Sequence, residues 1–361
     1  MTKQAHPGEH TVSIKDVAAH AGVSISTVSH VLNDTKYVGS ELRMRVLKAA
    51  DELQYQANAL AKGLKSGRTN TLCVLVPSIV SVFFPRVLRG MQMAAAQSGF
   101  ALTIYETGEN LLKEQEIIHM LRRQWMDGIL LSTCCDPETD GAYIEELRSL
   151  CIGGKRIPVV FFEEAPGEGL DAVVVDNRRA SYEAAKHLIE TGRKRIAYLA
   201  APMRRFAMGR NRYEGYRAAL READLPVEEA LFCEGDYTPV SGYERMKALL
   251  GSGAAFDAVL CGNDQMAIGA MRALREAGRR VPQDAAVMGF DNNFPGTLVS
   301  PSLSTVSVPK QGMGKEAVEL LLWRMQNGFD APARKITLET SLIVRQSTDA
   351  TRETDWDLYD W

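Results

Sequence analysis

The sequence predicts two structural classes in one chain: an all-α helix-turn-helix head, then an α/β core with two lobes, each built on a doubly wound parallel sheet. Residues 12–57 contain short amphipathic segments separated by a glycine turn. From residue 71 onward, short apolar runs alternate with helical patterns, which is typical of parallel sheets with helices on both faces. The 361-residue chain is also too long for one small core.

Composition and charge are those of an ordinary globular protein, with 45% hydrophobic and 24% charged residues. Residues 1–70 hold nine Lys and Arg against six Asp and Glu, a formal charge of +3, which leaves −6 for the rest. A basic head is consistent with a polyanionic partner, although so small a difference could arise by chance. The sequence shows no basic-then-apolar signal sequence and no run of 18 apolar residues, so we expect a cytoplasmic protein without a membrane partner.

The six cysteines show neither a CxxC pair nor a Cys/His spacing suited to zinc. Most of them lie in or beside apolar runs, so we expect small buried thiols in a reducing compartment. We expect no metal and no cofactor.

The head contains two short predicted helices joined by a turn. Ser13 and Asp16 favour a helix start, and Gly22 follows the helix where a positive φ is often needed. Ser24 would cap the second helix, which covers 25–32. This arrangement matches a helix-turn-helix, although any small helical bundle could show it.

A third helix over 40–53 would complete the head. Its inward positions are expected to be Leu42, Val46, Leu47 and Ala50. The preceding residues 1–11 are polar and His-rich and are expected to be disordered.

The core pattern predicts that ligands bind at the carboxyl ends of its strands, in a cleft between two tandem α/β units. The expected strands are 71–76, 101–105, 128–131, 159–162, 173–175, 195–200, 258–261 and 286–290, with helices at 86–98 and 113–123.

The head resembles the lactose/galactose repressor family of bacterial transcription regulators. The resemblance rests on the runs 14–18, 21–24 and 27–33, and it continues through 43–55 and 58–65. Most members carry Arg at the position of His30, whereas the purine repressor carries His, so the head is most similar to the purine-repressor pattern.

This resemblance implies double-stranded DNA as a partner. Ile25, Ser26 and His30 would face base edges in the major groove, because His can bond guanine and Ile can contact a thymine methyl. The other residues implied in the head are Ser24, Thr27 and Asn33 for phosphates, and Lys15 and Lys36 for either role. Alternatively, Ile25 is a buried helix residue.

The segment 58–68 would be a hinge. A helix over 58–64 is too short to be stable alone, and Gly63 weakens it further, so it should fold only beside its dimer mate on DNA. The resemblance implies that Leu64 wedges into the minor groove and kinks the duplex, and that Asn58 and Lys65 also contact DNA. Relatives often have Pro where this chain has Ala57. Alternatively, the segment is a plain linker.

The resemblance extends through the core to about residue 347 and implies the periplasmic-binding-protein fold. The chain should cross between lobes near Asp171, Pro295 and Gly328. The expected regions are 1–11, a disordered terminus; 12–57, the helix-turn-helix domain; 58–68, the hinge; 69–348, the core (lobe 1 about 69–170 and 296–328, lobe 2 about 171–295 and 329–348); and 349–361, an acidic aromatic tail that is disordered or docks on the core or a partner.

Matching motifs imply a set of effector-binding residues, in which aromatic faces cover apolar ring surfaces and charged groups address polar edges. They are Phe83, Phe84, Ser132, Glu163, Arg212, Asn263, Asp264 and Asp291. Alternatives remain for several: the two Phe could be lobe core, Arg212 an ion-pair residue, and Asp264 a helix cap. Val308 replaces a Gln common in relatives, which predicts a less polar pocket there.

These expectations combine into a dimeric repressor on a palindromic operator, controlled by a sugar, a sugar phosphate or a purine-like effector; a tetramer is also possible. Its effector could act as inducer or corepressor. One alternative is a global regulator of the catabolite-control type, switched by a phosphorylated partner protein. A more remote one is a solute-binding protein without a DNA role. No dinucleotide-binding GxGxxG, P-loop or nucleophile elbow supports an enzyme.

Overall fold

The computed structural model describes residues 12–34, 36–55, 69–200, 202–203 and 207–353. The chain separates into two compact units, residues 1–69 and 70–361, and each is described by itself. The predicted hinge and the last eight residues of the tail lie outside the described residues.

The head is a three-helix unit of α1 (Ile14–Ala21), α2 (Ile25–Asn33) and α3 (Ser40–Glu52). The Asp16 carboxylate accepts hydrogen bonds from the Ser13 backbone N–H and hydroxyl, at 2.8 and 2.7 Å. Gly22 ends α1 with a φ of 63°, a conformation in which any other residue would be strained. The Ser24 hydroxyl accepts from the Thr27 N–H at 3.1 Å and so caps α2, as predicted.

The core of the head differs from the prediction in one helix. Val17, Val28 and Val46 are fully buried, one from each helix. Leu42 and Leu47 of α3 are 39% and 45% exposed, so the prediction that they point inward is wrong. Helix α3 has room for one narrow contact stripe against two short helices, and these leucines lie outside it.

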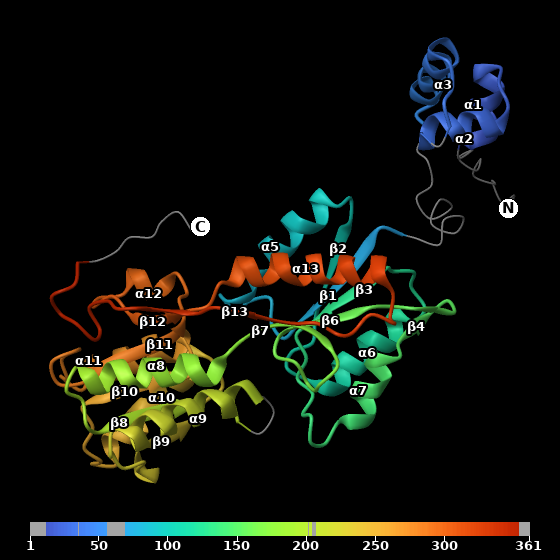
Figure 1. Ribbon diagram of the computed structural model, residues 1–361. Coiled ribbons are helices and arrows are strands. Elements are labelled where there is room, and N and C mark those ends of the chain that lie inside the picture. Colours follow the sequence, from blue (N-terminus) through green and yellow to red (C-terminus); the bar gives the residue numbers. More distant parts are fainter. Residues whose placement is uncertain (1–11, 35, 56–68, 201, 204–206, 354–361) are drawn as a thin grey trace, which may run out of the picture. The chain divides into compact units, whose positions relative to one another are not determined.

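The first core sheet has six parallel strands in the order β13-β7-β6-β3-β1-β2 (Figure 1). Its strands are β1 (Thr71–Val76), β2 (Ala101–Glu106), β3 (Gly128–Leu131), β6 (Val159–Glu163), β7 (Asp171–Val175) and β13 (Lys335–Leu338). Helices α5 (Phe84–Gln97) and α13 (Lys310–Asn327) pack together over one face, and α6 (Leu111–Leu121) and α7 (Gly141–Arg148) cover the other. A two-stranded hairpin, β4 (Cys151–Ile152) and β5 (Lys155–Arg156), follows α7.

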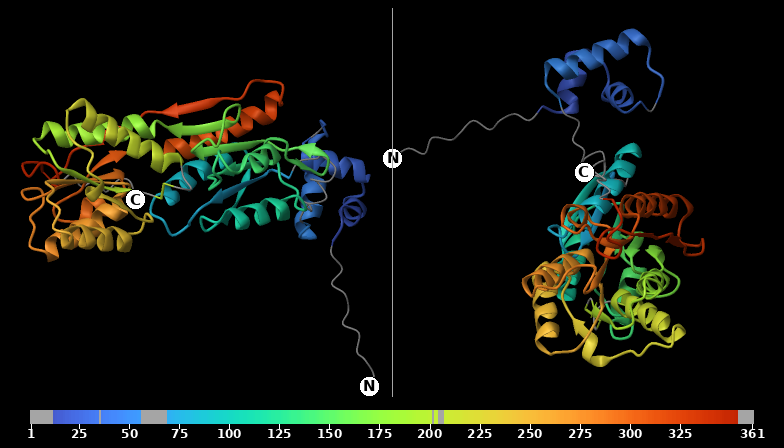
Figure 2. Two further views of the ribbon diagram at one scale, coloured as in Figure 1. Left: turned by 90° about the horizontal axis from the view of Figure 1, so that it is seen from below. Right: turned by 90° about the vertical axis from the view of Figure 1, so that its left-hand side faces the viewer.

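The second core sheet repeats this plan, with the order β14-β12-β11-β10-β8-β9 and β14 antiparallel at one edge. Its strands are β8 (Ile196–Ala200), β9 (Phe232–Glu234), β10 (Ala258–Cys261), β11 (Ala286–Asp291), β12 (Ser304–Ser307) and β14 (Ser341–Ile343). Helices α8 (Asn177–Glu190) and α9 (Ala207–Glu222) cover one face, and α10 (Pro239–Gly251) and α11 (Asp264–Glu276) the other (Figure 2). The short helices η1 (Glu229–Leu231) and α12 (Pro295–Leu298) complete the lobe.

The chain crosses between the sheets later than predicted at each of the three points. Strand β7 pairs with β6 and β13, so the first crossing follows 175 rather than lying near Asp171. The second follows β12, near 308–309 rather than Pro295, and the third lies at 339–340 rather than Gly328. Lobe 1 thus comprises about 70–175, 310–327 and 335–338, and lobe 2 most of the rest of the described core. The first crossing was misplaced because an apolar run that reads as a buried strand fits either lobe equally well. The other two were misplaced because the short strands β12 and β13, which precede them, were not predicted.

The strand segments predicted in the core are all present, most within one or two residues of their expected ends. Strands β9, β12, β13 and β14 were not predicted, and each has only three or four residues. All six cysteines are free; four are buried, whereas Cys151 is exposed and Cys233 half-buried. Within the described part of the chain, no helix is long and apolar enough to cross a membrane, and no cluster of side chains could hold a metal ion.

Candidate functional site

The head presents the N-terminal end of α2 to solvent. Ser24, Ile25 and Ser26 are exposed, and the Ile25 side chain has an exposed fraction of 45%. The alternative that Ile25 is a buried helix residue is therefore wrong. Thr27, in the first turn of the helix, and His30, in the next turn, are half-buried.

Hydroxyl groups gather at this helix end. The Ser24 Oγ lies 2.7 Å from the Ser26 Oγ and 2.8 Å from the Thr27 Oγ1. Hydroxyls beside the free N–H groups of a helix N-terminus suit a phosphate oxygen. Lys15 and Lys36 are exposed on the same unit. The Asn33 side chain, Asn58, Leu64 and Lys65 lie outside what the structure describes, so their predicted roles stay predictions.

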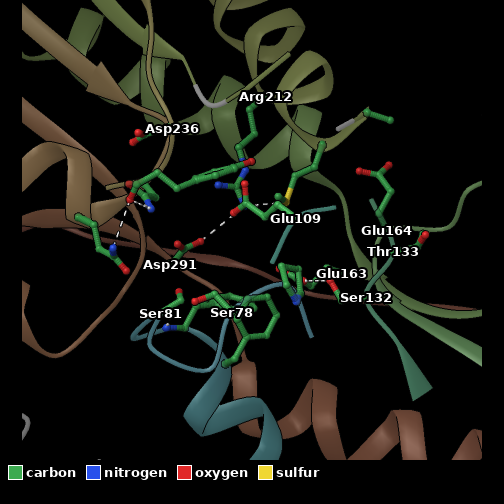
Figure 3. Close-up of a pocket in the computed structure, with 18 of the residues that line it drawn as sticks. Ser78, Ser81, Glu109, Ser132, Thr133, Glu163, Glu164, Arg212, Asp236 and Asp291 are labelled. Carbon is green, nitrogen blue, oxygen red and sulfur yellow. Dashed lines mark hydrogen bonds and ion pairs between the residues drawn. The ribbon is translucent and has the colours of Figure 1, made fainter. Parts of the chain in front are cut away.

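The core contains a pocket of about 200 Å³ between its two lobes (Figure 3). The segments after β1, β3, β6, β10 and β11 supply its walls, as expected for parallel sheets. Seven of the eight predicted effector residues line it: Phe83, Phe84, Ser132, Glu163, Arg212, Asn263 and Asp291.

Lobe 2 holds Arg212 in a network that satisfies each of its nitrogens. Its Nε donates to the Asn177 Oδ1 at 2.8 Å and its Nη1 to the Gly262 carbonyl at 2.6 Å. Its Nη2 donates to the Met208 Sδ at 3.3 Å and lies 3.5 Å from the Asp291 Oδ1. The guanidinium also lies over the Phe290 ring, 3.6 Å from its centre. Arg212 is thus both a pocket residue and an ion-pair residue.

Asp264 does not line the pocket, so its predicted contact with effector is not supported. It is 1% exposed, and its oxygens accept from the Thr305 hydroxyl at 2.6 Å and the Asn293 N–H at 2.5 Å. The helix cap is its neighbour Asn263, whose Oδ1 accepts from the Met266 N–H at 2.9 Å. Two adjacent polar residues at a helix start look alike in sequence, and only the packing separates their roles.

Lobe 1 supplies two aromatic rings and a hydroxyl–carboxyl pair. Phe83 and Phe84 meet edge to face, 5.2 Å apart, and both belong to the hydrophobic core while lining the pocket. Ser132 donates to the Glu163 Oε2 at 2.5 Å. Figure 3 shows this pair opposite Arg212 and Asp291.

Several pocket carboxyl groups are shifted toward their protonated forms. Burial raises the pKa of Glu163 to about 8, with Asp291 adding to the rise and Ser132 and Arg212 opposing it. Burial also raises the pKa of Glu164 to about 7, although the Met208 N–H opposes the shift. The pKa of Asp291 is raised by burial too, against the opposing charges of Arg212 and Lys310.

Direct contacts join the lobes at the pocket. Arg210 of α9 lies 3.5 Å from the Asp136 carboxylate, which follows β3. The Glu164 carboxyl accepts from the Met208 N–H at the start of α9. Lys310, at the start of α13, donates to the carbonyl oxygens of Asp291 and Asn292.

Several lining residues were not predicted from the sequence, among them Glu109, Glu164, Asp236, Tyr237 and Gln265. Some could have been found, because Glu109 and Glu164 follow predicted strands. Asp236 and Tyr237 follow β9, whose three residues are too short to recognise. By contrast, Val308 is 4% exposed within the hydrophobic core and does not line the pocket, so its effect on pocket polarity is not supported.

Four pocket residues share an unusual backbone. Glu109, Glu163, Tyr237 and Asp291 have φ values of 55°, 69°, 68° and 103°, although none is glycine. Such conformations cost free energy and persist where the surrounding structure holds them, most often at functional sites. This feature supports the pocket as the functional site of the core.

Known protein families match both the head and the core of the chain. A family model described as bacterial regulatory proteins, lacI family, matches residues 13–58, and one described as a periplasmic binding protein-like domain matches 185–348. The HTH-type transcriptional repressor PurR of Escherichia coli O1:K1 / APEC is 35% identical over 337 residues, 93% of this chain and 96% of the relative.

Solved structures show the same architecture. The Lac repressor dimer bound to operator and the anti-inducer ONPF is 27% identical, covers 93% of this chain and 99% of that one, and has a TM-score of 0.84. The complex of the transcriptional regulator CelR with cellobiose is 31% identical with the same coverage and a TM-score of 0.69. This chain therefore belongs to the lacI family of bacterial transcriptional repressors.

Proposed function

We propose that this chain is a cytoplasmic homodimeric repressor that binds a palindromic DNA operator and is controlled by a small molecule in its core pocket. The observation that carries the DNA-binding part is the exposed end of α2. An apolar Ile25 and three hydroxyl side chains together offer contacts for a thymine methyl and for phosphates.

Exposed apolar side chains and an unpaired strand edge in lobe 1 support the dimer. Strand β2 is an edge strand, and Ile104 on it is 46% exposed. Met93 of α5 and Leu112 of α6 are 47% and 70% exposed. Unpaired strand edges and apolar side chains in one lobe are features that a second copy would cover.

The pocket supports control by a small molecule rather than by a phosphorylated partner protein. It combines a concave shape, two aromatic rings and convergent polar groups, as ligand sites do. Its walls come from both lobes, so an occupant would bias the angle between them. We propose that this angle sets the spacing of the two hinges on DNA.

Selection of bound sequences from a random DNA pool tests the proposal. The full chain should enrich a palindrome, and enrichment of no sequence would contradict it. Ile25→Ala should relax base preference at one position of each half-site, with a loss of about 1 kcal/mol in discrimination. Met44→Ala, at an apolar residue 68% exposed on α3, is the matched control and should leave the selected sequence unchanged.

A further inference from the structure

Carboxyl groups dominate the described lining of the pocket. Five of those lining residues carry one: Glu109, Glu163, Glu164, Asp236 and Asp291. Arg212 is the single described lining residue with a positive charge. An anionic ligand would therefore meet the like charges of Asp236 and Asp291. The Glu163 and Glu164 carboxyl groups, which burial shifts toward their protonated forms with raised pKa values, add no positive charge to offset them.

Arg212 has little left to offer a ligand anion. Its four hydrogen-bond and ion-pair partners belong to lobe 2 itself, and Asp291 already faces its charge. Two other cations at the pocket are also engaged, Arg210 with Asp136 and Lys310 with backbone carbonyls. A phosphate would have to displace these contacts and would leave Asp291 uncompensated.

We propose that the carboxyl groups of this pocket, Glu163 foremost, select an uncharged, hydroxyl-rich effector and exclude phosphorylated or carboxylated ones. This inference rests on the proposed function, since it assigns the chemistry of the effector that controls the repressor.

The position of Glu163 fits that role. It ends β6 with a φ of 69°, held by the Ser132 hydroxyl, and faces the pocket. A carboxyl group kept protonated by burial both donates and accepts, which matches the two capacities of a sugar hydroxyl. Glu164 adds an acceptor, because its buried Oε2 has no hydrogen-bond partner among the described residues.

The pocket also has an aromatic wall that can contact the apolar face of such a ligand. The rings of Phe83 and Phe84 form one wall, and the C–H face of a sugar ring packs against aromatic rings in this way. The pocket thus pairs an aromatic wall with carboxyl groups, and both suit a neutral polyol.

The test uses the full chain without DNA and measures thermal stability and calorimetric binding with matched probes. The probes are glucose, ribose and cellobiose; glucose 6-phosphate and ribose 5-phosphate; gluconate; glucosamine; and hypoxanthine and adenosine. At least one uncharged sugar should raise Tm in a concentration-dependent way, and any phosphate ester should bind about tenfold more weakly than its parent or not at all.

Three results would overturn the inference. One is a phosphate ester or carboxylate that binds more tightly than its parent sugar. Arg204 and Arg205 are not among the described residues, so the ester is also tested on the double variant R204A/R205A. An ester whose binding is lost in this double variant would overturn the inference as well. The others are preference for a base, nucleoside or amino sugar over every uncharged sugar, and no binding by any uncharged sugar.

Variants assign the selection to Glu163. Glu163→Ala, which removes both the donor and the acceptor, should weaken binding of the preferred sugar about tenfold, and Glu138→Ala, at an exposed residue of the same lobe, should not. Equal affinities in both variants would contradict the assignment. The assay does not involve DNA, so loss of operator recognition would leave this result intact. Conversely, a phosphorylated effector would overturn this inference alone.

Discussion

The two lobes contribute to the same pocket in different ways. Lobe 2 brings a charged pair that is already formed, Arg212 with Asp291, and behind the pocket wall Asp264 accepts hydrogen bonds from Thr305 and the Asn293 backbone. Lobe 1 brings two aromatic rings and the carboxyl groups of Glu163 and Glu164, which burial shifts toward protonation.

One half of the pocket, in lobe 2, is therefore preformed, whereas the other half, in lobe 1, gains contacts when a ligand binds. Groups that satisfy one another hold their geometry whether or not a ligand is present. Groups with spare hydrogen-bonding capacity gain partners only when a ligand arrives, so they contribute to specificity more than to stability. Variants in lobe 2 should therefore mostly reduce stability, and variants in lobe 1 should mostly change what binds.

The largest effect should follow removal of the central cation of lobe 2. Arg212→Ala leaves Asp291 buried without its partner, and breaking a buried pair in this way costs about 3–5 kcal/mol. Urea unfolding measures the loss. The control is Arg210→Ala, whose ion pair with Asp136 is partly exposed and is worth at most about 1 kcal/mol. Similar losses in the two variants would show that the buried pair of Arg212 and Asp291 is worth no more than the partly exposed pair of Arg210 and Asp136.

A glycine under Asp264 gives the next largest effect. A Cβ at position 289 would lie 2.2 Å from the Asp264 Oδ1, so Gly289→Ala must displace a carboxyl that has two hydrogen bonds. We expect a loss of about 1–3 kcal/mol in the free energy of unfolding. Gly251→Ala has no atom within 4 Å of its new Cβ and should change stability by less than about 0.5 kcal/mol. If both alanine variants are as stable as the parent, the Asp264 carboxyl can move without a measurable loss of its hydrogen bonds.

The contrast between lobes also explains what the sequence could predict. Seven of eight proposed effector residues line the pocket, because the family resemblance implied them and the chain has the fold of that family. Asp264 failed because it lies beside Asn263 at the same helix start, and the partners that bury it come from 41 and 29 residues away. The lobe boundaries failed because β7 and β13 complete the first sheet through long-range pairing, which local patterns do not contain.

The buried carboxyl group of Glu163 in lobe 1 should make the stability of the protein depend on pH. The folded pKa of Glu163 lies near 8, above its ordinary value of 4.5, so folding favours the protonated form. Its contribution is fully present below pH 4.5 and is lost as pH rises through the folded pKa near 8, at up to about 1.4 kcal/mol per pH unit in that interval.

Glu163→Gln should remove this part of the pH dependence, because Gln keeps the shape and does not titrate. Asp291, Arg212 and Glu164 face the same position and remain in both proteins, so the difference between the two pH profiles reports Glu163. Chemical denaturation at a series of pH values between 4 and 9 provides the measurement. A profile of unchanged slope would show that Glu163 titrates as an ordinary exposed carboxyl.

The smallest effect concerns the ion pair that joins the lobes. Arg210 and Asp136 lie 3.5 Å apart with side chains 32% and 18% exposed, so Asp136→Asn should cost less than about 1 kcal/mol. Because the pair spans the pocket, its loss should nevertheless shift the balance between lobe orientations and change effector affinity about two- to fivefold. Calorimetry with the preferred sugar measures that change, and Glu138→Gln, at an exposed carboxyl two residues along the chain, serves as the control. If the affinity stays constant while stability falls, the pair stabilises the fold, as the contacts of lobe 2 do, and does not affect effector binding. Lobe closure would then depend on the contact between Glu164 and Met208 and on the segments that cross between the lobes.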